Sequence, residues 1–207
     1  MIELLNMDCM EYMATLPDKA FNLAIVDPPY GIGRDKKQNK NEGKWRFKRY
    51  HDSEWDNDSP SPEYFKELFR ISKNQILWGA NHYIEKIPFN SSCWLIWDKV
   101  NGGGDFADCE LAWTSLKGAV RQFTYYFGTE NNERIHPTQK PKQLYKWILS
   151  RYATPDMRII DTHLGSGSSA IAAYDFGCDF VGMEIDKDYY DAAVKRFNIH
   201  KMQTKLF

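Results

Sequence analysis

The segment Asp27-Pro28-Pro29-Tyr30 holds residue types that suit the binding of an amine attached to a flat ring. Two consecutive prolines remove two N–H donors and hold the backbone extended, so the carbonyl and carboxylate acceptors beside them stay available. An amine that donates hydrogen bonds to the Asp27 carboxylate and the Pro28 carbonyl would be drawn towards tetrahedral geometry, with its lone pair free to attack an electrophile. The Tyr30 ring could stack on the base that carries the amine. An ordinary proline turn is the alternative interpretation.

A second segment, residues 159–169, has the composition of a loop that binds a nucleotide-like cofactor. The apolar run up to Asp161 predicts a strand, and Gly165 and Gly167 would let the backbone after it approach a ligand closely. Glu184 ends the next predicted strand, where an acid can bind a pair of ribose hydroxyls. Neither the three-glycine phosphate fingerprint nor a Walker sequence is complete, which favours a cofactor with a ribose and no pyrophosphate over NAD or ATP. A tight strand-to-helix turn is the alternative.

The segment 31–60 is predicted to be a long surface loop, because it shows no apolar periodicity. Residues 34–49 carry eight basic residues and two acids, whereas the whole chain has a formal net charge of −1. A chain without overall attraction to nucleic acid needs such a local patch, and aromatic residues within it can stack on unpaired bases. A solvated excursion is the alternative. The nucleic-acid-binding residues predicted from this pattern are Lys36, Lys37, Lys40, Lys44, Trp45 and Arg46.

The rest of the chain alternates short apolar runs with segments of helical spacing. Strands are predicted at 21–26, 75–78, 93–97, 111–113, 122–126, 158–161 and 180–183. Helices are predicted from Ser61, at 141–152, at 168–176 and at 188–199, the last with Tyr190, Ala193, Val194 and Phe197 on its apolar face. This alternation predicts an α/β fold with a doubly wound, mainly parallel sheet and helices on both faces. Crevices form at the carboxyl ends of such strands, so Asp27 and Gly165 are expected to face one cleft.

Composition restricts the class of protein. The 207 residues are 43% hydrophobic and 27% charged, as in an ordinary globular chain of one domain. No apolar run has the length of a membrane span and the amino terminus has no secretory pattern, so a cytoplasmic location and no membrane partner are expected. The four cysteines, at 9, 93, 109 and 178, form no C-x-x-C pair and the histidines show no metal spacing. This pattern argues against a disulfide framework and against a zinc site.

Three motifs together resemble the amino-DNA methyltransferases that modify adenine N6 or cytosine N4. They are Asp27-Pro28-Pro29-Tyr30, His136-Pro137-Thr138-Gln139-Lys140-Pro141 and Asp161-x-x-x-Gly165-Ser166-Gly167. Their order is similar to that of the β group of this family, and the resemblance runs from Asp8 to about Phe197. It implies one methyltransferase domain over residues 1–207 with a Rossmann-like sheet of seven strands. Residues 31–60 are then an insertion at the DNA-facing cleft.

The resemblance implies S-adenosylmethionine as methyl donor, S-adenosylhomocysteine as product, double-stranded DNA as substrate, and no metal. It further implies a bacterial or phage-encoded enzyme of the restriction-modification type. An aspartate at the head of the first motif favours adenine N6 over cytosine N4 by family tendency. The catalytic residues implied are Asp27, Pro28, Pro29 and Tyr30. The donor-binding residues implied are Asp8, Thr138, Lys140, Asp161, His163, Gly165, Ser166, Gly167 and Glu184.

The sequence departs from the family pattern at two places. Thr162 and His163 stand where Pro and Phe are usual, and His163 is interpreted either as a contact to the donor or, preferably, as a ring that fills the same space. Few residues precede His136 for target recognition, so the loop, a second subunit in a homodimer, or low specificity would have to account for it. Methylation of cytosine N4 or of an RNA base stays an open alternative. A catalytically inactive nucleic-acid-binding module on the same fold is another.

Overall fold

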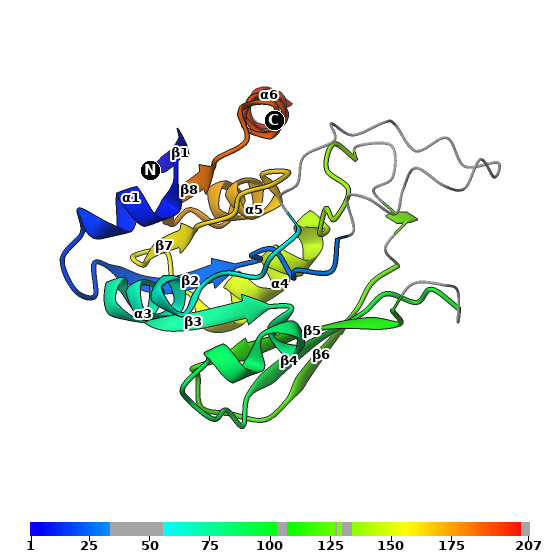
Figure 1. Cartoon of the computed structure of the whole chain (residues 1–207). Coiled ribbons are helices and arrows are strands. Elements are labelled where there is room, and N and C mark those ends of the chain that lie inside the picture. The colour runs from blue at the N-terminus through cyan, green and yellow to red at the C-terminus, as the bar shows by residue number, and fades with distance from the viewer. Residues whose placement is uncertain (34–55, 103–106, 127, 130–133, 204–207) are drawn as a thin grey trace.

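The computed structural model describes residues 1–33, 56–102, 107–126, 128–129 and 134–203 (Figure 1). Its strands are β1 (Ile2–Asn6), β2 (Phe21–Val26), β3 (Ser72–Trp78), β4 (Trp94–Asp98), β5 (Cys109–Thr114), β6 (Arg121–Thr124), β7 (Arg158–Asp161) and β8 (Asp179–Glu184). Its α-helices are α1 (Cys9–Ala14), α3 (Pro62–Ile71), α4 (Lys142–Tyr152), α5 (Ser168–Phe176) and α6 (Lys187–Gln203), and two 3-10 turns are η1 (Ala80–His82) and η2 (Ile84–Lys86).

The strands form one sheet in the order β1-β8-β7-β2-β3-β5-β4-β6. Every neighbouring pair is parallel except the two pairs that contain β5. The predicted mainly parallel α/β sheet is therefore confirmed. The predicted number of seven strands is wrong, because the described part of the chain forms eight. The additional strand is β1, which lies at the edge of the sheet, pairs with β8 alone and has a mixed pattern of exposure instead of an apolar run.

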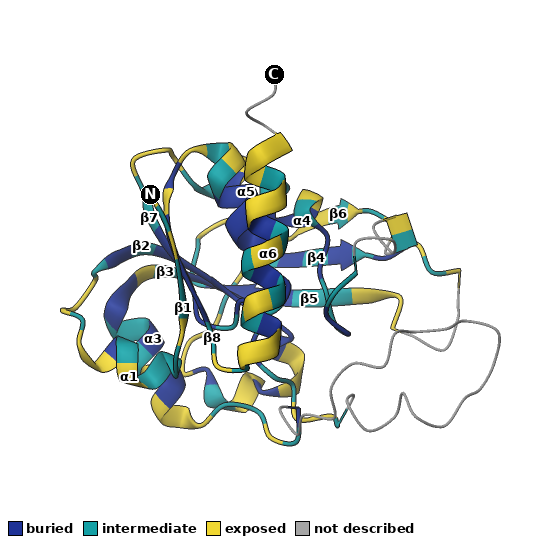
Figure 2. Cartoon of the chain, turned by 90° about the horizontal axis from the view of Figure 1, so that it is seen from above, coloured by how far each residue is buried: buried dark blue, intermediate teal, exposed yellow. Residues whose placement is uncertain are grey.

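Helices cover both faces of the sheet, as the prediction required. On one face α4, α5 and α6 pack on the strands around Leu144, Ile148, Ala170 and Phe197. On the other face α1 and α3 contribute Met13, Tyr64, Phe65, Leu68 and Ile71 to a second core cluster. Figure 2 shows the buried side of the helices turned towards the strands and the exposed side of α6 turned outwards.

The helix boundaries follow local signals in the sequence. Helix α3 begins at Pro62, and α5 ends before Gly177, whose φ of +85° suits a glycine at a helix carboxyl end. In α6 the buried residues are Tyr189, Ala193 and Phe197, at successive steps of four. The predicted apolar face is thus confirmed at Ala193 and Phe197 and wrong at two positions, since Tyr190 and Val194 are only half-buried and Tyr189 is buried instead.

Candidate active site

Four acidic residues stand at one edge of the sheet. Asp161 and Glu184 end β7 and β8, while Asp27 directly follows β2 and Asp8 lies two residues after β1. These four strands are neighbours and run parallel, so their carboxyl ends meet along the same edge. The arrangement brings the Asp-Pro-Pro-Tyr motif and the glycine-rich loop to the same edge of the sheet as Asp8 and Glu184, although these segments lie far apart in the sequence.

The Asp27 carboxylate is held from two sides. Its Oδ1 accepts a hydrogen bond of 2.7 Å from the Tyr30 hydroxyl, and its Oδ2 lies 2.5 Å from the Lys140 ammonium. The Lys140 side chain is 2% exposed and that of Asp27 is 16% exposed. The resemblance had placed Lys140 beside the methyl donor, whereas the structure places its ammonium directly against Asp27.

Lys140 also joins Asp27 to a second carboxylate. Its Nζ lies 2.9 Å from Glu110 Oε2 and 3.0 Å from the Tyr30 hydroxyl, and Glu110 Oε1 lies 2.5 Å from Lys99 Nζ. We call these five residues, Asp27, Tyr30, Lys99, Glu110 and Lys140, the carboxylate–lysine cluster. Its two acids and two lysines balance in charge, as buried ionic groups require. Neither Glu110 nor Lys99 was predicted, because a single charge at a strand end resembles an ordinary solvated residue.

Burial and mutual attraction set the pKa values in the cluster. Burial raises the pKa of Asp27, Lys140 opposes that rise, and the nearby charge of Glu110 adds to it. Burial also raises the pKa of Glu110, but Lys140 and Lys99 outweigh it and bring the value to about 2. Burial lowers the pKa of Lys140, and the two carboxylates more than reverse this. Glu110 is therefore a carboxylate and Lys140 an ammonium at neutral pH.

The Tyr30 ring is fixed by three groups from outside its own motif. It stacks on His82 with ring centroids 5.0 Å apart and an angle of 16°, and it lies against the α-carbon of Gly79. The backbone N–H of Tyr30 donates to Asp56 Oδ1 at 2.8 Å, and the N–H of Gly31 donates to the same oxygen at 3.0 Å. Asp56 is 2% exposed, although it lies in the segment 31–60 that is predicted to be a surface loop.

Two acids, Asp161 and Glu184, accept hydrogen bonds from the glycine-rich loop after β7 and from the start of α5. Asp161 accepts from the backbone N–H of His163 at 3.1 Å and from the Ser169 hydroxyl at 2.6 Å, and burial raises its pKa to about 7. Glu184 Oε2 accepts from the N–H of Gly165 at 2.9 Å, and its Oε1 accepts from the N–H of Asp186 at 3.0 Å. Glu184 thus contacts the glycine-rich loop from the end of β8.

Both glycines of the loop have left-handed backbones. Gly165 has a φ of +51° and Gly167 a φ of +73°, values that favour glycine. A β-carbon on Gly167 would lie 3.3 Å from that of Ala193, so the start of α5 packs tightly on α6. Ser166 contributes its carbonyl as an acceptor for Arg196 at 2.9 Å.

His163 belongs to a hydrogen-bonded chain of three side chains. Its Nδ1 lies 2.9 Å from the Thr162 hydroxyl, which lies 2.6 Å from the Tyr64 hydroxyl. Burial lowers the pKa of His163 to about 4, so the ring is neutral at pH 7. Thr162 and His163, the two residues of the glycine-rich loop that depart from the family pattern, therefore contact each other.

The remaining predicted donor-binding residues have the following places. Asp8 caps α1 by accepting from the N–H of Met10 at 2.7 Å. Thr138 lies beside His136, with its hydroxyl 3.2 Å from the ring Nδ1. The ring of His136 packs edge-on against Tyr189 with centroids 4.4 Å apart. The predicted nucleic-acid-binding residues Lys36, Lys37, Lys40, Lys44, Trp45 and Arg46 lie outside the described residues.

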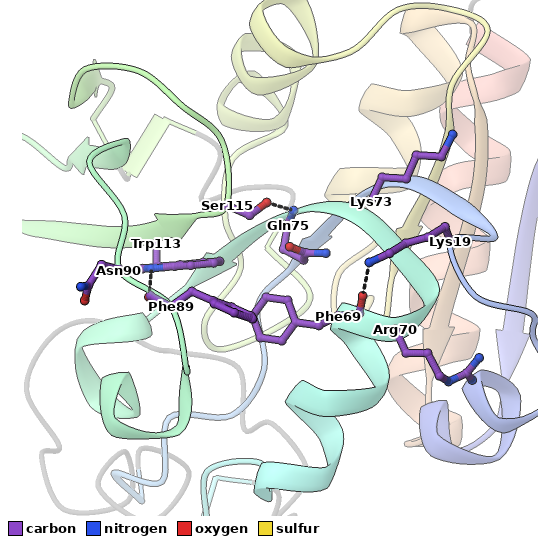
Figure 3. Close-up of a pocket in the computed structure, with 9 residues that line it drawn as sticks. All are labelled: Lys19, Phe69, Arg70, Lys73, Gln75, Phe89, Asn90, Trp113 and Ser115. Carbon is purple, nitrogen blue, oxygen red and sulfur yellow. Dashed lines mark hydrogen bonds between the residues drawn. The ribbon is translucent and has the colours of Figure 1, made fainter.

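A pocket of about 550 Å³ lies at the opposite end of β3 from Trp78 (Figure 3). Aromatic side chains form one wall and basic side chains part of its rim. Its lining residues are Lys19, Phe69, Arg70, Lys73, Gln75, Phe89, Asn90, Trp113 and Ser115. None of the predicted site residues is among them.

Metal sites, cysteines and membrane-spanning helices are the remaining candidate features. Within the described residues, no group of three His, Cys, Asp or Glu side chains could hold a metal ion. The four cysteines are free, and Cys109 is exposed whereas Cys93 and Cys178 are buried. The helices that the structure describes include none that is long and apolar enough to span a membrane.

Known methyltransferases are similar to this chain over most of its length. The chain is 28% identical to the type II methyltransferase M.HinfI of Haemophilus influenzae over 93% of its own length and 67% of the relative's. It is 23% identical to the type II methyltransferase M.HpaI of Haemophilus parainfluenzae, over 92% of the chain and 72% of the relative.

Solved structures share the fold. The M1.HpyAVI–S-adenosylmethionine complex superposes with a TM-score of 0.66 at 21% identity, covering 96% of this chain and 100% of that one. The cytosine-N4-specific PvuII DNA methyltransferase superposes with a TM-score of 0.61 at 14% identity, covering 95% and 86%. The family model described as DNA methylase matches residues 47–195. The chain therefore belongs to the N6/N4 DNA methylase family and is a DNA amino-methyltransferase.

Proposed function

We propose that the protein transfers a methyl group from S-adenosylmethionine to N6 of adenine in double-stranded DNA. The observation that carries this proposal is the Asp27 carboxylate, fixed beside the glycine-rich loop at the carboxyl edge of the sheet. The preference for adenine rests on the aspartate at the head of the Asp-Pro-Pro-Tyr motif. Because M.HinfI and M.HpaI are type II methyltransferases, we further propose that the protein serves a restriction-modification pair.

The residues around the loop fit S-adenosylmethionine. The Glu184 carboxylate is fixed by two backbone N–H groups, and each of its oxygens keeps a lone pair that can accept from a ribose hydroxyl. Gly165 is half-buried and presents backbone without a side chain, and Asp8 follows the strand next to β8. When bound, S-adenosylmethionine supplies a methyl group activated by a sulfonium. In this proposal the donor also contacts Thr138, Asp161, His163 and Ser166.

Asp27 and Pro28 would act on the target amine. An ionised carboxylate offers about four lone-pair sites, of which the Tyr30 and Lys140 contacts use two. An amine that donates one N–H to Asp27 and the other to the Pro28 carbonyl would have its lone pair free to take the methyl group, with S-adenosylhomocysteine as the leaving group and the surplus amine proton released by way of Asp27. His82 already stacks on Tyr30, so a base that stacks on this ring shares it with His82 or displaces it. Lys36, Lys37, Lys40 and Lys44 are proposed to hold the DNA backbone. A homodimer and a cytoplasmic location stay predictions.

Methyl transfer with a labelled donor tests the proposal. The purified chain is incubated with methyl-labelled S-adenosylmethionine and unmodified double-stranded DNA, and the DNA is digested to nucleosides for mass spectrometry. We expect N6-methyladenine in DNA, and no label when RNA replaces the DNA. N4-methylcytosine would replace the proposed base. DNA binding without transfer would support the inactive module instead. DNA that the enzyme has already modified to completion is the control, since it should accept no further label.

A further inference from the structure

We propose that Glu110 is a positioning residue for methyl transfer. It holds the Lys140 ammonium beside Asp27 and shares its charge, so that Asp27 stays a fixed and strongly accepting carboxylate. This inference rests on the proposed function, in which Asp27 accepts a hydrogen bond from the target amine. Glu110 belongs to none of the motifs that the family resemblance uses.

The direction of β5 brings Glu110 to the site. β5 is antiparallel to both of its neighbours, so its first residues lie beside the carboxyl ends of β3 and β4. The register pairs Trp78 with Ala112 and Asp98 with Cys109. Glu110, near the start of β5, therefore stands at the same edge as Asp27, and Lys99 reaches this edge from the end of β4.

The Lys140 ammonium has three N–H donors, and the structure supplies three acceptors. They are Asp27 Oδ2 at 2.5 Å, Glu110 Oε2 at 2.9 Å and the Tyr30 hydroxyl at 3.0 Å. Because the lysine side chain is 2% exposed, water has little access to it and could not readily take the place of a lost acceptor. Glu110 thus fixes the position of the group that fixes one oxygen of Asp27.

The charges of the cluster explain why a second carboxylate matters. With Glu110 present, the charge of Lys140 is divided between two acids, and Lys99 balances Glu110 from its other side. Without Glu110, Lys140 would pair with Asp27 alone and withdraw more of its electron density. The pKa of Asp27 would then fall, because a like charge nearby had helped to raise it.

Other ionisable groups also face Asp27 from the surrounding elements. Three of them are tyrosines whose pKa burial raises well above its usual value, and one is an acid on the next strand. They are Tyr30, Tyr83, Tyr145 and Asp161, in addition to Lys140 and Glu110. The tyrosines stay neutral at neutral pH, and Asp161 keeps its contacts to His163 and Ser169 in both proteins. Glu110→Gln therefore changes the charge around Asp27 by removing the Glu110 carboxylate and by changing the share of the Lys140 charge that Asp27 receives.

The test is steady-state methyl transfer by Glu110→Gln across a range of pH. We expect kcat to fall by about tenfold or more, as for loss of a preorganised group at a reacting centre. KM for S-adenosylmethionine should stay within about twofold, because the change acts on the other substrate. The acid limb of kcat/KM should move to lower pH by about one unit, since Asp27 loses a neighbouring negative charge. Glu110→Asp should recover part of kcat, and Glu85→Gln, at an exposed position, is the matched control.

A double-mutant cycle with Lys140→Met tests whether Glu110 acts through Lys140. We expect the double variant to have the same kcat as Lys140→Met alone. Because it lacks one charge of each sign, it also covers the case in which Glu110→Gln leaves the buried lysines unbalanced and does not fold. Losses that multiply in the double variant would overturn the proposal. So would an unchanged kcat and acid limb in Glu110→Gln. If the unmodified protein transfers no methyl group, the proposed function fails and this inference falls with it.

Discussion

The ring of Tyr30 lies against the α-carbon of Gly79, in space that the β-carbon of any other residue would fill. Gly79 follows β3 directly and has a φ of +73°. The strand next to β2 therefore ends in a residue that provides both the turn and the surface on which the tyrosine rests. The position of Tyr30 depends on this glycine as much as on its own motif.

Gly79→Ala should displace Tyr30 and break its hydrogen bond to Asp27. We expect turnover to fall by about tenfold or more, since the geometry of the reacting centre changes. Gly177→Ala is the control, because it has the same kind of backbone at φ +85° with no atom within 4 Å of the added carbon. It should lose about 1 kcal/mol of stability and keep its turnover. Equal turnover in the two variants, measured with equal amounts of folded protein, would contradict the role of Gly79.

Asp27→Ala should abolish methyl transfer and spare donor binding. Loss of the acceptor for the target amine is expected to cost about 100-fold or more in turnover. Affinity for S-adenosylmethionine, measured by titration calorimetry, should change little because Glu184 and the glycine loop are intact. Asp156→Ala, at an exposed position before β7, is the control. An alanine variant that keeps more than about a tenth of wild-type turnover would remove Asp27 from the mechanism.

Glu184→Ala should affect the other substrate. Loss of charge-assisted hydrogen bonds to the ribose is expected to weaken donor binding by about 1.5–3 kcal/mol, while DNA binding without donor stays the same. Asp186→Asn is the control, because Asp186 accepts from the N–H groups of Asp188 and Tyr189, and an asparagine can do the same. Calorimetry that finds unaltered donor affinity in Glu184→Ala would exclude the ribose contact.

His163→Phe should make stability less sensitive to acid. Burial holds the pKa of His163 at about 4, whereas the unfolded residue binds a proton near its ordinary value of about 6.5. The free energy of unfolding therefore falls as the pH drops from about 6.5 to about 4, by up to about 1.4 kcal/mol per pH unit for one histidine. Urea unfolding at pH 7 and pH 4.5 should show a smaller loss in the phenylalanine variant. His136, with a pKa of about 3, titrates in both proteins and does not disturb the comparison.

The proposed DNA binding by the basic segment, residues 34–49, can be tested although these residues lie outside the described part of the chain. Replacement of four lysines by glutamine should weaken DNA binding and reduce the salt dependence of log affinity by nearly one unit per lost phosphate contact. Donor binding should stay intact. The positions are Lys36, Lys37, Lys40 and Lys44.

A second quadruple variant controls for net charge. It removes the same number of charges from exposed lysines elsewhere, and its salt dependence should match that of the wild type. These positions are Lys66, Lys73, Lys117 and Lys195. If the two quadruple variants have the same salt dependence, the basic segment does not contact phosphates.

Local pattern predicted most elements of the fold. Each of the seven predicted strands overlaps a strand of the structure, and the glycine after α5 ends the helix as expected. The pattern missed β1, because a short edge strand with one neighbour has no continuous apolar run. It also could not give the strand order, since pairing depends on contacts between segments distant in the sequence.

The same distinction applies to the site. The motifs predicted Asp27, Lys140 and the glycine loop as site residues, because local chemistry constrains their residue types, but they did not predict that Lys140 pairs with Asp27. Glu110 and Asp56 were not predicted as site residues. Each is a single charged residue in a short segment, and it acquires its partners only when the sheet brings distant segments together. Gly79 carried a local signal, a glycine directly after a predicted strand, but nothing in the sequence shows that a tyrosine rests on it.

The strand order has a consequence for synthesis of the protein. β7 and β8 lie between β1 and β2, yet the ribosome makes them after the six other described strands. A nascent chain that ends before β7 therefore has two strands with no neighbour between them, and their exposed edges invite pairing with other chains. The edge of the sheet that carries Asp8 and Asp27 cannot close until Asp161 and Glu184 have been added. The site is therefore completed only after the six other described strands have been made, and a chain that ends before β7 would lack a continuous sheet as well as the loop.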